Sequence, residues 1–213
     1  MTRATTEGAA TPAIISPSRR DAPVLGHTIA TAFHSLPASQ YLVPDPERRR
    51  NVYGAYFRLA VEDALEQGTV YAIGEGAAVA LWMPVPAEGL PEVELDHRLT
   101  RIDDLAERDF AFHQALHARH PFDRGAHQWL MILAVRPGRQ GQGLGSLLLD
   151  AHHDHLASLD PEQRVGTYLE AASMRARDFY RSRHGYFDVG DPIELPNRSL
   201  MYPMWREPHS ATS

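Results

Sequence analysis

The chain has 213 residues, a formal net charge of −6 and no cysteine. This length suits one domain with a full core, which we expect at 13–208, between a disordered N-terminal tail at 1–12 and a short C-terminal tail at 209–213. The lack of cysteine excludes disulfides, thiolate metal sites and acyl-cysteine intermediates. An acidic chain suits nucleic acid poorly, and no apolar run approaches the roughly 20 residues that span a bilayer. We therefore expect a cytoplasmic protein with no nucleic-acid or membrane partner.

The first third of the chain predicts a short edge strand and two helices. Residues 13–16 are typical of an edge strand, and Asp21 stands at the N-cap position of a helix with apolar residues at helical spacing. The proline-containing segment 37–46 predicts a turn. A long helix is then expected over 47–66, closed by Gly68.

The next segment predicts an antiparallel hairpin over 69–83, because two β-rich runs flank the glycines of 74–76. Three prolines and a glycine indicate a loop over 84–91. Residues 92–119 predict a helical region, broken near Thr100 and ended by Pro121.

The centre of the chain predicts a strand, a glycine-rich turn and a helix. Residues 129–135 are seven consecutive apolar residues, which favours a strand buried on both faces. From 144 to 159 the leucines recur at helical spacing. A strand at 164–172, a helix at 174–184 and strands near 186–194 and 198–206 are expected to follow. Such an alternation predicts a mixed sheet with helices on both faces.

The glycine-rich turn is typical of a phosphate site. Glycines at 141, 143 and 145 leave backbone amides uncovered at a helix start, where the helix dipole favours an anion. A P-loop would need Lys and Ser/Thr where Leu144 and Gly145 stand. A dinucleotide fingerprint would need Gly or Ala in place of Ser146, so both familiar nucleotide motifs are excluded.

The pattern Gln140-x-x-Gly143-x-Gly145 after a buried strand resembles the acetyl-CoA motif of the GNAT superfamily of N-acetyltransferases. Downstream, Phe179-Tyr180 followed by Gly185-Tyr186 resembles a second signature of that family, with Tyr186 in place of the common Phe. The order of segments over most of 13–208 is similar to the puromycin N-acetyltransferase branch, although only 128–187 is specific.

The resemblance implies a GNAT-like α/β fold, with a mixed, mostly antiparallel sheet, helices on both faces and a splayed central strand. It implies acetyl-CoA as the acyl donor. Ser173 stands where many members have an Asn that contacts the cofactor, and Arg177 could reach a CoA phosphate. The implied cofactor-binding residues are Leu133, Ala134, Val135, Gln140, Gly141, Gln142, Gly143, Leu144, Gly145, Ser146, Ser173 and Arg177.

Two residues are the predicted catalytic groups. An amine must lose a proton before it attacks a thioester, and Glu170 could accept that proton directly or through water. The departing thiolate needs a proton, which Tyr180 could donate, and a backbone N–H near Val135 could polarise the thioester carbonyl. By itself, a Glu in a strand is more often ion-paired, and a Tyr at such a position is more often a core aromatic.

The expected activity is direct acetyl transfer to a primary amine of a small molecule, such as an antibiotic-like or metabolite amine, by a monomer or homodimer. The predicted substrate pocket contains Phe33, Tyr53 and Trp82. Two alternatives stay open: acetylation of a protein N-terminus or lysine, and a noncatalytic acyl-CoA sensor.

Twelve histidines raise the question of a metal site. One group comprises His152, His153 and His155, and a second group, spaced i, i+4 and i+7, falls at 113–120. No Glu completes a His-Glu-x-x-His motif, and helical histidines are usually solvated. We therefore expect no metal.

Overall fold

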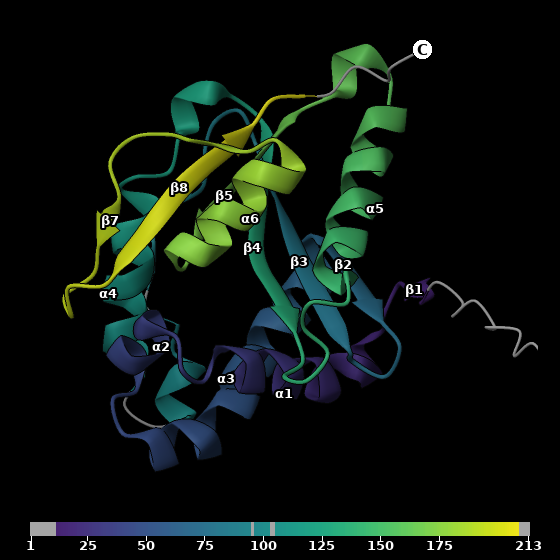
Figure 1. Ribbon diagram of the computed structural model, residues 1–213. Helices are drawn as coiled ribbons and strands as arrows, with labels where there is room; N and C mark the ends of the chain where they lie inside the picture. Colours follow the sequence, from purple (N-terminus) through teal and green to yellow (C-terminus); the bar gives the residue numbers. More distant parts are fainter. Residues whose placement is uncertain (1–11, 95, 103–104, 209–213) are drawn as a thin grey trace, which may run out of the picture.

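The strands pair in the order β1-β2-β3-β4-β5-β8-β6, with β7 also paired to β8 (Figure 1). The computed structural model describes residues 12–94, 96–102 and 105–208. The β4–β5 pair is parallel and the other pairs are antiparallel, as the GNAT-like fold class predicts. The strands are β1 Ile14–Ile15, β2 Thr69–Ile73, β3 Ala78–Val85, β4 His127–Val135, β5 Gly166–Ala171, β6 Phe187–Asp188, β7 Ile193–Glu194 and β8 Leu200–Arg206.

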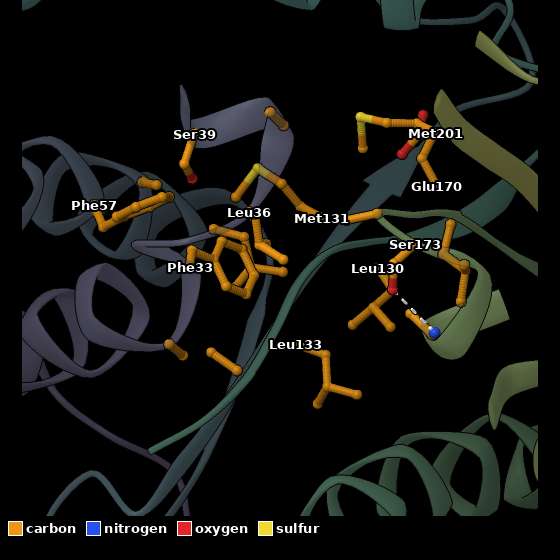
Figure 2. Close-up of a pocket in the computed structure, with 18 of the residues that line it drawn as sticks. Phe33, Leu36, Ser39, Phe57, Leu130, Met131, Leu133, Glu170, Ser173 and Met201 are labelled. Carbon is orange, nitrogen blue, oxygen red and sulfur yellow. Dashed lines mark hydrogen bonds between the residues drawn. The ribbon is translucent and has the colours of Figure 1, made fainter. Parts of the chain in front are cut away.

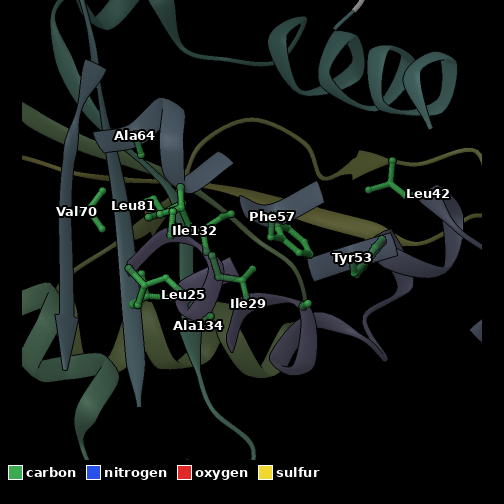
Figure 3. Close-up of a cluster of buried hydrophobic side chains, with 14 of the residues drawn as sticks. Leu25, Ile29, Leu42, Tyr53, Phe57, Ala64, Val70, Leu81, Ile132 and Ala134 are labelled. Atoms are coloured by element: carbon green, nitrogen blue, oxygen red, sulfur yellow. The ribbon is translucent and has the colours of Figure 1, made fainter. Parts of the chain in front are cut away.

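Helices cover both faces of the sheet (Figure 1). On one face α1 and α3 pack together over β3 and β4, where Leu25, Phe57 and Ile132 belong to one buried cluster (Figure 3). On the other face α5 and α6 pack over a second cluster that contains Leu148 and Tyr180. The helices are α1 Ala22–Phe33, α2 Pro37–Leu42, α3 Pro46–Gln67, α4 Ala106–His117, α5 Leu144–Ser158 and α6 Met174–His184.

The long helix α3 has the ends that its sequence predicts. Asp45 is the N-cap, and its side chain accepts a hydrogen bond of 2.6 Å from the Arg48 backbone N–H. Pro46 occupies the first helical position, where its missing N–H costs nothing. Gly68 ends the helix.

The proline-rich predictions were partly wrong. The turn expected over 37–46 contains the short helix α2, because Pro37 starts a helix as readily as it ends one. Pro84 lies inside β3, not in the following loop. Asp21 is the residue before α1, but its carboxylate accepts hydrogen bonds from the backbone and hydroxyl of Ser18 and does not cap α1.

The lengths of two predicted elements were also overestimated. The helical region expected over 92–119 is an α-helix only in α4, preceded by a 3₁₀ turn at Leu99–Arg101, and residues 95 and 103–104 lie outside the described part. The strand expected over 186–194 is divided into β6 and β7, because Gly190 between them has a φ of 70°. Apart from residue 12, the predicted tails at 1–12 and 209–213 lie outside the described residues.

The central strands separate partway along their length. β4 and β5 pair through four residue pairs only, from His127 with Gly166 to Leu130 with Leu169. Beyond Leu130, β4 stays paired with β3 as far as Val135, whereas the end of β5 pairs with β8. The sheet therefore opens between β4 and β5, which confirms the predicted splayed strand.

Within the described residues, no helix combines the length and the apolar character that crossing a membrane would require.

The close packing of α1 on α3 predicts opposite effects for two glycine substitutions. A Cβ on Gly26 would lie 2.7 Å from the Arg58 backbone nitrogen, whereas a Cβ on Gly54 would meet nothing within 4 Å. We expect Gly26→Ala to lower the free energy of unfolding by about 1–3 kcal/mol. We expect the control Gly54→Ala to raise it by about 0.5–1 kcal/mol, because Ala favours helices. Urea denaturation measures both, and equal effects would contradict this packing.

Candidate active site

A cavity of about 360 Å³ lies where β4 and β5 separate. Its walls come from α1, α2, α3 and α4 on one side, and from the ends of β4 and β5 and the start of α6 on the other. Figure 2 shows Phe33, Leu36 and Met131 facing this space, with Glu170 and Met201 at one end. The lining is largely apolar, so the few polar groups in it determine what it can bind.

Glu170 is partly buried and places its carboxylate in the cavity wall. It lies on β5 immediately beyond the last residue that pairs with β4. Its Oε2 accepts a hydrogen bond of 2.8 Å from the Trp129 indole N–H, while its Oε1 is buried and has no hydrogen-bond partner among the described residues. Burial raises the pKa of Glu170 to about 7, although the Trp129 hydrogen bond opposes this. At neutral pH this carboxylate can therefore both accept and release a proton.

A second polar group of the cavity is the imidazole of His113 on α4. Its Nε2 lies 3.3 Å from Oδ1 of Asp109, and the same oxygen accepts a hydrogen bond of 2.6 Å from the Tyr56 hydroxyl. Burial alone would lower the pKa of His113, but Asp109 and the more distant charge of Glu170 raise it overall. The cavity thus has, on the helical side, an imidazole whose protonated form Asp109 favours and, on the sheet side, an acid of raised pKa.

His113 was not among the site residues predicted from the sequence. The signal was present, because Asp109 and His113 are four residues apart and share one helix face. Their position opposite Glu170 depends on how α4 packs, which the spacing does not give.

Tyr180 lines the same cavity from α6 and is 9% exposed. Burial raises the pKa of its hydroxyl, so the hydroxyl stays protonated at neutral pH. None of the hydrogen bonds among the described residues involves this hydroxyl, so it is available as a donor.

The glycine-rich turn between β4 and α5 presents open backbone. Gly141 and Gly143 have φ values of 76° and 80°, in the left-handed region, and a Cβ on either would meet nothing within 4 Å. Gly143 is the N-cap of α5, and no side chain caps the helix there. Gln140 lines the cavity, so the exposed amides of this turn adjoin it. This arrangement suits an anion that extends from the cavity.

The residues after the turn have structural contacts of their own. Leu144 is buried in the core, so only its backbone can face a ligand. A Cβ on Gly145 would lie 3.6 Å from Leu133 and 3.7 Å from Val135, which places the start of α5 directly against β4. The side chain of Gln142 folds back to hydrogen-bond with Arg139, and the Ser146 hydroxyl lies 3.1 Å from Nε2 of His184.

Of the two predicted cofactor-binding residues at α6, Ser173 lines the cavity, whereas Arg177 is in an ion pair outside it. Ser173 lines the cavity and is the N-cap of α6, accepting a hydrogen bond of 3.2 Å from the Ala176 N–H. The guanidinium of Arg177 makes two hydrogen bonds to Asp188, of 2.5 and 2.6 Å. Arg177 would have to leave this ion pair to contact a phosphate.

Of the three predicted substrate-pocket residues, only Phe33 lines the cavity. Tyr53 is buried behind it and donates a hydrogen bond of 3.0 Å to the Ser39 carbonyl, and Tyr56, one turn further on, faces the cavity instead. Trp82 lies on the opposite face of the sheet, where its ring stacks on His152 at 4.0 Å. Periodicity identified both as buried but could not determine which buried side of the sheet or helix faces the cavity.

Comparison with known proteins agrees with this geometry. Residues 105–186 match the model of the acetyltransferase (GNAT) family. A crystal structure described as histone acetyltransferase HPA2 and related acetyltransferase, from Corynebacterium glutamicum, is 25% identical with a TM-score of 0.69, over 95% of this chain and 99% of that one.

Two other structures share the fold. Arylalkylamine N-acetyltransferase 2 from Aedes aegypti is 15% identical with a TM-score of 0.61, over 92% of this chain and 98% of that one. An agmatine N-acetyltransferase is 13% identical with a TM-score of 0.63, over 92% of this chain and 98% of that one.

The family match over 105–186, the fold and the opened sheet are together those of an acyl-CoA-dependent N-acetyltransferase, and they make this chain similar to the GNAT superfamily.

Proposed function

We propose that the protein transfers an acetyl group from acetyl-CoA directly to a primary amine of a small molecule, within a ternary complex. One observation carries this proposal: a single cavity joins the separated end of β4, a carboxylate with a pKa of about 7 and a tyrosine hydroxyl. We assign the activity to one domain over 13–208 of a cytoplasmic protein that acts as a monomer or homodimer.

The donor-binding residues of the proposal are the turn and the free edge of β4. The open amides at Gly141 and Gly143 would hold the CoA pyrophosphate, and the backbone of 133–135 would hydrogen-bond the pantetheine arm. Two observations support CoA binding here. A Cβ on either glycine would meet nothing within 4 Å, and the end of β4 is not paired with β5. Acetyl-CoA supplies an activated thioester, and the protein positions it.

The proposed base is Glu170. Amines are mostly protonated at neutral pH, so the nucleophile must lose a proton, and a buried carboxylate with a pKa of about 7 accepts it without holding it permanently. His113 on the opposite wall, held by Asp109 behind it, would orient a polar substrate. A backbone N–H near Val135 would stabilise charge on the thioester oxygen.

The proposed acid is Tyr180, whose protonated hydroxyl would donate to the departing thiolate. The chain has no cysteine and so cannot form an acyl-cysteine intermediate, which supports direct transfer.

The acceptor in this proposal is an amine attached to an apolar body. Phe33, Leu36, Phe57 and Met131 supply the apolar walls. Two structures with this fold, the arylalkylamine and agmatine N-acetyltransferases, are named for small amines. The resemblance to the puromycin N-acetyltransferase branch adds antibiotic-like amines to the candidate acceptors.

The experiment combines the protein, acetyl-CoA and a panel of arylalkylamines, polyamines, aminonucleosides and peptides. Release of free CoA thiol is followed with a colorimetric reagent, and the absence of cysteine removes the protein's own background. We expect turnover with small apolar amines and little with peptides. Turnover confined to peptides would favour a protein acetyltransferase, and acetyl-CoA binding without turnover would favour a sensor.

The raised pKa of Glu170 predicts a pH dependence. Only the ionised carboxylate accepts a proton, so kcat/KM should rise with pH through about 7. Glu170→Gln should lower kcat/KM by about 10²–10⁴-fold and remove this rise. The control Glu162→Gln makes the same chemical change at an exposed position and should behave as the wild type. An unchanged rise in Glu170→Gln would exclude Glu170 as the base.

Removing the Tyr180 hydroxyl tests the proposed acid. Tyr180→Phe should lower kcat by about 10²-fold while the Kd for CoA, measured by calorimetry, stays constant. Tyr71→Phe removes a hydroxyl outside the cavity and serves as the control. Equal rates in the wild type and Tyr180→Phe would rule out proton donation by this residue.

A further inference from the structure

A second cluster of chemically active side chains lies away from the cavity, between α5 and α6. Asp150 and His153 lie on α5, and His184 is the last residue of α6. Each offers one ligand atom, and these atoms all lie within 4.8 Å of one another. Both histidines are buried and Asp150 is exposed.

We propose that Asp150, His153 and His184 bind a divalent transition-metal ion, for which Zn²⁺ is the best match. Two imidazoles and one carboxylate are ligands that Zn²⁺ accepts, and water would occupy the fourth position. The proposed metal site is independent of the proposed acetyl transfer, because none of its ligands lines the cavity.

The distances fit this assignment. Nδ1 of His184 lies 3.3 Å from Oδ1 of Asp150. Two ligands of a tetrahedral Zn²⁺, each bonded at about 2.0–2.1 Å, are themselves about 3.3 Å apart. The third ligand is His153, and its ligand atom lies within 4.8 Å of the other two, so it needs to approach by at most about 1.5 Å for a regular site. The exposed side chain of Asp150 can follow the ion without disturbing the core.

The other nitrogens of both imidazoles already have the partners that metal-bound histidines need. Nε2 of His184 lies 3.1 Å from the Ser146 hydroxyl, and Nε2 of His153 lies 3.1 Å from the Tyr186 hydroxyl. Tyr186 is in turn hydrogen-bonded at 2.8 Å to the hydroxyl of Thr167. Coordination through Nδ1 would keep both contacts, with each Nε2–H as a donor. Such outer contacts fix ring orientation and favour metal binding.

An ion and its water can reach the site from solvent. The cluster forms part of a surface pocket whose lining also includes Asp154 and Glu207, together with Arg183 and Arg206. The two further carboxylates balance the two guanidinium groups. The geometry of the ligands, and not an excess of negative charge, is therefore what favours a metal here.

A bound ion would connect two helices that serve the cavity. α5 begins at the glycine-rich turn, and α6 carries Tyr180. A metal between Asp150, His153 and His184 would join the end of α6 to the middle of α5. We therefore expect it to stabilise the fold.

The test uses the full chain without an affinity tag, treated with a chelator and then titrated with Zn²⁺ against a chromogenic competitor. We expect one ion per chain, and Co²⁺ in its place should give the visible absorption of a tetrahedral site. Zn²⁺ at 100 times its Kd should raise Tm by about 5 °C or more. Failure to bind one equivalent would overturn the proposal.

Matched variants separate coordination from simple charge attraction. Asp150→Asn, at an exposed position that tolerates the change, should weaken Zn²⁺ binding by about 10-fold or more. Asp154→Asn removes the same charge one helical turn away and should change affinity less than about 2-fold. His184→Asn should abolish the Co²⁺ spectrum, with folding checked by circular dichroism. Equal weakening by Asp150→Asn and Asp154→Asn would refute coordination.

Discussion

The early end of the β4–β5 pairing is the constraint on which the rest of this site depends. After Leu130 the two strands no longer pair with each other: β4 remains paired with β3, and β5 remains paired with β8, its partner from Thr167 to Ala171. Beyond Leu130, the backbone N–H and C=O groups of β4 on the β5 side have no partner strand among the described residues. They can therefore hydrogen-bond with water or a ligand. The same separation makes room for the cavity and places Glu170, the next residue after Leu169, in its wall.

Burial gives this cavity its chemical character. Glu170 is removed from water with one oxygen unpaired, and its pKa rises to about 7 as a result. On the facing wall, Asp109 favours the charged form of His113 and holds the Tyr56 hydroxyl. A carboxylate that titrates near neutral pH suits the removal of a proton from an amine, and Glu170 is the group of this cavity that meets the condition.

The helix α5 connects the cavity with the cluster of Asp150, His153 and His184. Its first residues follow an open glycine turn beside the cavity, and its middle carries Asp150 and His153. Ser146 belongs to the first turn and lies next to His184, so the two regions share a hydrogen bond. Ion binding at the histidines would therefore act on the same helix that begins the proposed pyrophosphate site.

The sequence by itself determined the local elements: the buried strand, the glycine turn and the helix after it, together with the fold class and the acyl-CoA chemistry that the motif implies. These follow from hydrophobic periodicity and from glycines at left-handed positions, which are properties of neighbouring residues. Periodicity also placed Tyr53 and Trp82 in buried positions. Only the tertiary structure showed that neither faces the cavity, and that Tyr56 and His113 do.

The histidine cluster is the clearest case of the same limit. In the sequence, His153 was grouped with its neighbours on one helix, and no metal motif was present. Packing of α6 against α5 brings His184 to it from 31 positions further along the chain. Spacing along a helix specifies a shared face within that helix, whereas the juxtaposition of two helices depends on the whole core that packs them together.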